Sequence, residues 1–260
     1  MTSPGAYLRI VFAIANRSII RIVRRPQSLT PIFLVPTIFL LVTSGGAARA
    51  INLPGFPQVD SFFEFAIAGA ILQSTMLGGL MTGITLSIDV DNGFFDRMIV
   101  APVPRSALVL GRVLGSAILA LFQAGLYLAL GVAFGAGIHA GVLGVLIVLV
   151  LAALCAASLG GLAVALSLRA QAQWVQGMFP LVFVIIFLSS AFFPRALLTE
   201  PAASVAGYNP ISYIAEGMRE PIISGISTTT MINAFLVAIG MAIFTSLISV
   251  WALRVRLGTD

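Results

Sequence analysis

Residues able to do chemistry are few in this chain and lie far apart. The sequence contains one histidine, His139, and one cysteine, Cys155, and neither lies near a cluster of acidic residues. Neither a histidine-activated nucleophile nor a metal site of ordinary ligand spacing is therefore predicted. All 14 basic residues are arginines, so the lysine that a phosphate-binding P-loop requires is missing as well. We expect no enzymatic activity and no cofactor or metal bound by this chain.

One polar segment, residues 89–106, has a pattern that could serve recognition. Asp91 or Asn92 can cap a short helix whose first turn contains Gly93, and Pro102 and Pro104 end it. Such a helix is amphipathic, with apolar residues at Phe94, Phe95, Met98 and Ile99 and charges at Asp96 and Arg97. From the residues alone, a helix that fills a groove in another protein and a simple connecting loop both remain open.

The elements that must position this segment are membrane spans. Of the 260 residues, 59% are hydrophobic and 9% are charged, with a mean hydropathy of +1.09, whereas soluble domains carry about 25% charged residues. A spanning helix needs about 20 mostly apolar residues. Six segments meet this length: residues 29–48, 62–88, 108–134, 141–168, 177–193 and 231–253. The sequence predicts an all-α polytopic membrane protein with six transmembrane helices in a single domain, residues 1–260.

The arginines predict the orientation of these spans. With six spans both ends of the chain share one side, and 11 of the 14 arginines fall on that side. Arg49, Arg195 and Arg219 fall on the other side. Because arginine and lysine accumulate in cytoplasmic loops, we expect both termini and residues 89–106 in the cytoplasm.

The segment before the first span, residues 1–27, predicts an interfacial amphipathic helix. Its arginines and apolar residues alternate, which is not typical of a cleaved secretory signal. One helical face gathers Leu8, Val11, Phe12, Ala15, Ile19, Ile22 and Val23. The arginines expected at the membrane surface are Arg17, Arg21, Arg24 and Arg25, each contributing about 1 kcal/mol with anionic head groups. Two interpretations remain, a topological anchor and a helix that also moves as the protein works.

Residues 194–230, on the outer side, are too apolar for an ordinary loop and too interrupted for a span. Pro194, Pro201, Pro210 and Pro221 divide them into short pieces. Irregular backbone at membrane depth must be buried in protein or line a wet cavity, so we expect one or two short re-entrant helices here. Among the spans, the spacing of Gly111 and Gly115 predicts close helix packing.

Three ordered motifs carry a resemblance to a known family. Residues 89–112 resemble the acidic, Asn-Gly-containing coupling segment of ABC transporter type 2 export permeases, although that family often has Glu at the positions of Asp89 and Asp91 and Thr-Leu at those of Phe94 and Phe95. Residues 171–173 with 187–194 resemble the fifth-helix region of these permeases, and residues 209–219 resemble their outer re-entrant motif. Within the family, the chain is most similar to permeases of daunorubicin-resistance-type drug exporters.

This resemblance implies roles for named residues. Contact with an ATPase is implied for a coupling helix comprising Asp89, Asp91, Asn92, Gly93, Phe94, Phe95, Asp96, Arg97, Met98, Ile99, Pro102 and Arg105. The second and fifth helices of such permeases line the path, which implies path positions at Gln73, Met76, Phe183, Phe187 and Ser190. The outer motif corresponds to Asn209, Pro210, Tyr213, Glu216 and Arg219.

The resemblance also implies a function and partners. It implies a permease subunit in the bacterial cytoplasmic membrane that exports a hydrophobic or amphipathic substrate such as a drug, an antibiotic or a lipid-like molecule. The expected partners are two ATPase subunits, which hold ATP and magnesium, a second permease, identical or related, and the lipid bilayer, but no nucleic acid. The alternative is a free-standing carrier or channel that works without an ATPase.

Overall fold

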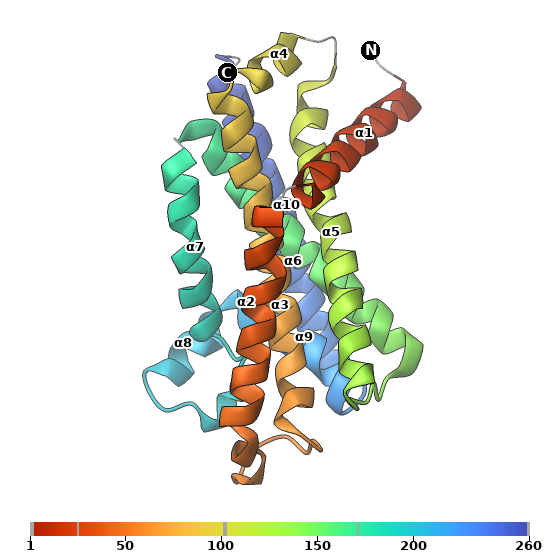
Figure 1. The fold of residues 1–260 in the computed structure, drawn as a ribbon, viewed down its shortest axis with the longest axis vertical. Helices are drawn as coiled ribbons and strands as arrows, with labels where there is room; N and C mark the ends of the chain where they lie inside the picture. Colours follow the sequence, from red (N-terminus) through yellow and green to blue (C-terminus); the bar gives the residue numbers. More distant parts are fainter. Residues whose placement is uncertain (1–2, 25, 101–102, 171, 259–260) are drawn as a thin grey trace.

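The structure is a computed structural model that describes residues 3–24, 26–100, 103–170 and 172–258. Every regular element within these ranges is a helix (Figure 1). The elements are α1 (Pro4–Val23), α2 (Pro26–Gly46), η1 (Ala48–Asn52), α3 (Phe62–Asp91), α4 (Phe94–Val100), α5 (Arg105–Ala133), α6 (Gly141–Arg169), α7 (Ala172–Phe187), η2 (Arg195–Leu197), α8 (Ala202–Tyr208), α9 (Pro210–Ile223) and α10 (Thr228–Arg256).

Within the described residues, five helices are long and apolar enough to cross a membrane: α2, α3, α5, α6 and α10. The sixth predicted span differs from its prediction. We expected residues 177–193, but α7 has 16 residues and both begins and ends earlier. At 1.5 Å per residue it is about 24 Å long, shorter than the hydrocarbon core of about 30 Å. The expected bounds were wrong because side chains from α9 and the residue before it end the helix at Phe187, as described below.

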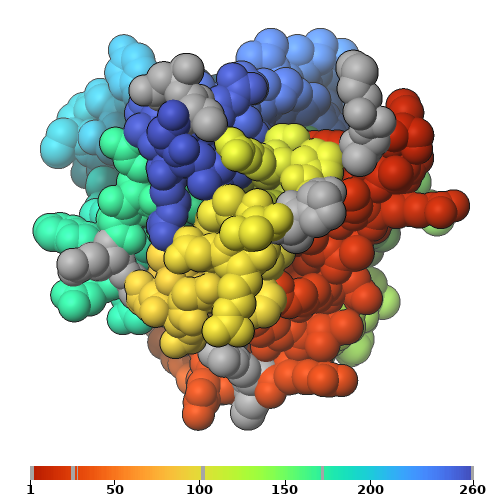
Figure 2. Space-filling model, turned by 90° about the horizontal axis from the view of Figure 1, so that it is seen from above, coloured from red at the N-terminus to blue at the C-terminus, as the bar shows by residue number. Residues whose placement is uncertain are grey.

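The helices are arranged around α3, which is buried along its whole length. It packs against α2, α5, α6, α7 and α9. In Figure 1, α1, α4 and the last turns of α10 lie at one end of the bundle, and η1, α8 and the first turns of α10 lie at the other. Seen from the first end, α4 lies between α1 and the end of α10 (Figure 2).

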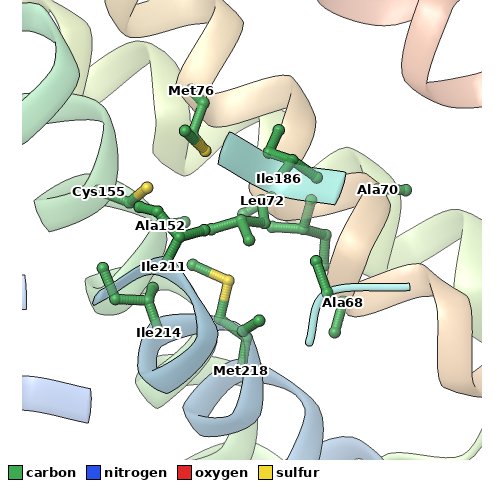
Figure 3. Packing of buried hydrophobic residues seen from close by; sticks show 14 of the residues in the cluster. Ala68, Ala70, Leu72, Met76, Ala152, Cys155, Ile186, Ile211, Ile214 and Met218 are labelled. Carbon is green, nitrogen blue, oxygen red and sulfur yellow. The ribbon is translucent and has the colours of Figure 1, made fainter. Parts of the chain in front are cut away.

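The core lies where α3, α6, α7 and α9 meet (Figure 3). Leu72 and Met76 of α3 lie beside Cys155 of α6 and Ile186 of α7, all fully enclosed. Small residues let the central backbones approach closely, since a Cβ on Gly83 would overlap Ala163 of α6. Such close approach is how helices gain packing energy in a bilayer.

The contact of α1 with α5 confirms close packing at Gly111 and Gly115. A Cβ on Gly111 would lie 2.7 Å from the Cβ of Ile14, and one on Gly115 would lie 3.1 Å from the carbonyl oxygen of Ala15. The apolar face predicted for α1 does not all face the membrane, because part of it packs inside the protein and part is exposed. Val11, Ala15 and Ile22 are buried in the protein, whereas Leu8, Phe12 and Val23 are exposed.

Candidate functional site: the α4 helix and the ion cluster beneath it

The turn that leads into α4 needs a glycine. Gly93 has a φ of +66°, a conformation that glycine adopts without a steric penalty. The backbone N–H of Asn92 donates to the carbonyl of Ile88 over 3.1 Å, which ends α3. Helix α4 then begins at Phe94, as the sequence predicted within one residue.

The buried face of α4 is the face that was predicted to bind a partner. Phe95 is fully buried, and Met98 and Ile99 are half-buried in the same cluster, formed with α3, α5, α6 and the end of α10. In this conformation Phe95 packs against its own chain and is not accessible to a partner. Met98 and Ile99 keep part of their surface exposed, so the docking role predicted for them stays a prediction.

The opposite face of α4 is open. Val100 is 86% exposed and Phe94 is 37% exposed, and both Asp96 and Arg97 are exposed. Asp91, Asn92 and Arg105, on either side of the helix, are also exposed. These residues are available to a partner. Pro102, predicted for the same role, lies outside the described residues.

Arginines from two other helices hold α4 in place. The guanidinium of Arg17 on α1 lies 4.0 Å from the ring centroid of Phe94 and donates to the sulfur of Met98 over 3.1 Å. The guanidinium of Arg256 on α10 lies 3.6 Å from the carboxylate of Asp96. These contacts connect α4 to α1 and α10, the two helices that flank it in Figure 2.

Beneath α4 lies a cluster of three charged side chains, which sequence reasoning did not find. The carboxylate of Asp89 at the end of α3 accepts from Arg112 of α5 over 2.6 Å and also pairs with Arg21 of α1. The side chains of Asp89 and Arg112 are each only 4% exposed. Because buried charges require partners, this cluster ties three helices together at one point.

The ion cluster corrects two predicted roles. Asp89 was expected to contact an ATPase, but it is enclosed and cannot reach one in this conformation. Arg21 was expected to face lipid head groups, and it turns inward to Asp89. Arg24 is exposed as predicted, while Arg25 lies outside the described residues. The spacing of apolar residues on α1 gave no sign that an acidic side chain on α3 would attract one of its arginines.

At the other end of the bundle, Asn209 ends one helix and begins another. Its side-chain N–H groups donate to the carbonyls of Ile185 over 2.8 Å and Leu188 over 3.1 Å. Its side-chain oxygen accepts from the backbone N–H of Ile211 over 2.9 Å, with Pro210 as the first residue of α9. Terminal carbonyls of α7 are thus satisfied without a further helical turn.

Arg219 of α9 also stabilises the turn that follows α7. It is buried, and it donates to the carbonyls of Ser190 over 2.8 Å, Ala191 over 2.5 Å and Phe65 over 3.4 Å. Its guanidinium also lies 3.9 Å from the ring centroid of Phe65. Irregular backbone after α7 is therefore enclosed and hydrogen-bonded by protein.

The remaining residues of the outer motif join α8 and η2 to α9. The Tyr213 hydroxyl donates to the carbonyl of Gly207 over 2.9 Å. Glu216 accepts from the Ser190 hydroxyl over 2.7 Å and pairs with Arg195 over 2.6 Å. Arg195 was missed by the sequence analysis, where it counted only toward the charge of the outer side.

The predicted path residues differ in their exposure. Gln73 and Ser190 are completely enclosed within the chain, so in this conformation neither faces a path. Met76 is also enclosed. Phe183 is half-buried beside Phe179. Phe187 alone is exposed, at 51%.

These features define a polytopic all-helical membrane protein with a short surface helix fixed across one end of its bundle. The chain belongs to the ABC-2 type transporter family, whose model matches residues 9–223. Members of this family are the transmembrane permease components of ABC transporters, and this chain is a transporter permease of that class.

Similar proteins of known description support this assignment. The chain is 26% identical over 200 residues to the daunorubicin resistance ABC transporter permease protein DrrB1 of Streptomyces coeruleorubidus, covering 75% of this chain and 68% of that protein. It is 23% identical over 211 residues to the putative transport permease ycf38 of Porphyra purpurea, and 25% identical over 213 residues to that of Pyropia yezoensis. Each of these two matches covers 80% of this chain and 72% of the relative.

Proposed function

We propose that this chain is the permease subunit of an ATP-driven exporter of hydrophobic or amphipathic molecules, and that a partner ATPase docks on the outward face of α4. The family supplies the class of protein, and the resistance permease among its relatives favours a drug-like substrate. ATP and magnesium then belong to the partner. Two ATPase subunits and a second permease complete the proposed transporter.

The observation that carries the proposal is the mounting of α4. Its open face presents Phe94, Arg97 and Val100. Its other face packs on the ends of the long helices through Phe95, and Arg17 of α1 and Arg256 of α10 contact Phe94 and Asp96 of the open face. A partner that pushes on the open face would therefore move several helices at once. Exposed aromatic and arginine side chains are those that anchor protein interfaces.

The direction of each helix supports the proposed topology. In Figure 1, α7 runs alongside the long helices from the α4 end of the bundle toward α8, without reaching the end where η1 lies. If α7 and the hydrogen-bonded turn that follows it complete a sixth crossing, α1 and the end of α10 share one side. The arginine distribution then places that side, with α4, in the bacterial cytoplasm. Helices α8 and α9 form the re-entrant structure on the opposite side.

The face made by α2 and α7 is the proposed contact with the second permease. Helix α2 is mostly exposed, with Leu34, Ile38 and Leu41 each at least half exposed. Phe39 of α2 lies 5.3 Å from Phe187 of α7, measured between ring centroids. These apolar and aromatic side chains favour a path for a hydrophobic substrate between the two permeases.

The test is to disrupt the open face of α4 without touching its buried face. Arg97→Glu and Val100→Glu should abolish co-purification of the ATPase and substrate-stimulated ATP hydrolysis in the reconstituted transporter. Thr229→Glu, an exposed position at the opposite end of the bundle, is the matched control and should leave both unchanged. Membrane insertion of each variant is checked by its recovery in the washed membrane fraction. Normal ATPase binding and stimulation in the α4 variants would overturn the docking assignment to α4. Transport by the permease without any nucleotide would replace this proposal by the free-standing carrier.

A further inference from the structure

A small cavity lies between α1, α3 and α5, next to the ion cluster beneath α4. Its volume is about 10 Å³, which is room for one water molecule or one monatomic ion. Polyatomic anions such as phosphate are too large for it. Helix α1 supplies most of its wall, and the lining residues are Ile14, Arg17, Ser18, Arg21, Asp89 and Arg112.

The charged side chains around this cavity do not balance. Three are arginines and one is Asp89, so their net charge is +2. Both carboxylate oxygens of Asp89 are already engaged, one by Arg21 and the other by Arg112. Arg17 faces the uncharged ring of Phe94. Because Arg17 and Arg21 both repel Arg112, a further negative charge at this point would stabilise the packing of α1 on α5.

Two donor groups at the cavity have no acceptor. The Ser18 hydroxyl and the Nε–H of Arg112 have no hydrogen-bond partner within the described residues, although Ser18 is only 6% exposed and Arg112 only 3%. Buried serines elsewhere, such as Ser158 and Ser249, donate to the carbonyl four residues earlier. Because an unsatisfied buried donor is costly, both groups need an acceptor in the cavity.

We propose that this cavity binds one chloride ion, which accepts hydrogen bonds from Ser18 and Arg112 beside the positive charge of Arg17. The monatomic size follows from the volume of the cavity, and the negative charge follows from the excess of arginines. A water molecule would fill the space but leave that excess uncompensated. Arg17 is the exposed member of the lining, so the ion enters past its side chain. Once bound, the ion joins α1 to α5 at the base of α4.

The test uses the full chain in an uncharged detergent, without an ATPase. Thermal unfolding is followed while sodium chloride replaces sodium gluconate at constant ionic strength, so that screening stays the same. The unfolding midpoint should rise with chloride and then saturate, because a ligand that binds only the folded protein stabilises it. Bromide should replace chloride in this effect. A midpoint that is the same in chloride and in gluconate would overturn the proposal.

Variants of α1 separate a chloride ion held in the cavity from ions at other arginines. Ser18→Ala should raise the chloride concentration of half effect about tenfold, as expected when one hydrogen bond to an ion is lost. Asn16→Ala, at an exposed position of the same helix, is the matched control and should leave that concentration unchanged. If Ser18→Ala does not fold, Arg17→Gln replaces it, with the exposed Arg24→Gln as its control. Equal chloride dependence in variant and control would mean an adventitious ion only and would refute the site.

Crystals of the full chain grown with bromide locate the ion directly. Anomalous scattering at the bromine absorption edge should give a peak between Ser18 and Arg112. A cavity that holds only a water molecule would give no such peak, and the proposal would then be wrong. Because none of these measurements requires an ATPase or transport, their failure would leave the proposed function of α4 untouched.

Discussion

Arg112 donates to the carboxylate of Asp89 over 2.6 Å at a point where both side chains are almost completely enclosed. Asp89 belongs to α3, the central helix, and Arg112 belongs to α5. Arg21 of α1 pairs with the other carboxylate oxygen. Because the turn into α4 starts three residues after Asp89, this pair fixes the base of the surface helix to two further helices.

Replacing Asp89 should destabilise the protein more than any change at a neighbouring acidic residue. Asp89→Asn leaves two guanidinium groups facing each other without a counter-charge. Breaking one partner of a buried ion pair costs about 3–5 kcal/mol. We expect a loss of this order in the free energy of unfolding, measured by SDS titration in mixed micelles. Asp91→Asn, at an exposed position on the same turn, should change it little.

A double-variant cycle checks that the effect arises from the pair. Asp89→Asn combined with Arg112→Gln should be less destabilising than the sum of the two single changes, because the double variant no longer leaves Arg112 buried without its partner. Strictly additive losses would show that the two residues act independently, contrary to the geometry.

The two adjacent phenylalanines of α4 should differ in what their replacement by alanine changes: protein stability at Phe95 and ATPase binding at Phe94. Phe95→Ala removes a fully buried ring, and such changes cost about 3–5 kcal/mol. Phe94→Ala removes a partly exposed ring that contacts Arg17, so stability should change by about 1 kcal/mol or less. Under the proposed function, ATPase co-purification should fall in the Phe94 variant while the fold is retained. Equal stability losses at the two positions would contradict the observed orientation of α4.

The sequence predicted most of the spans because their apolar length is a local property. It located α4 for the same reason, since Gly93 and the nearby polar residues mark a turn. It could not say which way α4 faces, because an apolar stripe suits a partner's groove and the protein's own core equally well. Phe95, Met98 and Ile99 pack against the protein's own core because the ends of four long helices provide an apolar surface next to α4.

Long-range hydrogen bonds account for the other differences. Nothing in the sequence of α7 stops it at Phe187, since residues 188–193 contain no glycine or proline and only two serines interrupt the apolar run. The helix ends there because the side chain of Asn209, more than 20 residues later, donates hydrogen bonds to the carbonyls of Ile185 and Leu188. In the same way, Arg21 was assigned to lipid because its buried partner, Asp89, lies on another helix.

The packing of α1 on α5 predicts a sharp contrast between two glycines of one helix. Gly111→Ala would bring a methyl group within 2.9 Å of the carbonyl oxygen of Val11 and closer to Ile14, so α1 must shift. Gly125→Ala meets nothing within 4 Å and should raise helix stability slightly. Thermal unfolding followed by circular dichroism should show a lower midpoint for the first variant only. A lower midpoint for both would mean that α5 tolerates no added methyl group for reasons unrelated to α1.

The proposed orientation predicts which engineered cysteines are accessible in sealed cells. Ser227→Cys, before α10, should react with a membrane-impermeant maleimide from outside. Ser3→Cys, before α1, should react only after the membrane is opened. The native Cys155 is buried and should give little background. Labelling of both engineered positions from outside would place α1 on the outer side and rule out an even number of crossings.

Arg219 should stabilise the turn after α7 far more than the neighbouring Arg195 does. Arg219→Met would leave the buried carbonyls of Ser190 and Ala191 without their donor, and each unsatisfied group costs about 1–3 kcal/mol. Arg219→Lys keeps the charge but offers fewer donors in a less fixed arrangement, so it should recover only part of the loss. Arg195→Met is the matched control, since a partly exposed ion pair contributes about 0–1 kcal/mol. Hydrogen exchange of residues 186–192 should accelerate in the Arg219 variants and remain slow in the control. Equal acceleration in Arg219→Met and Arg195→Met, with none in Arg219→Lys, would show that the outer cap depends on its net charge and not on the hydrogen bonds of Arg219.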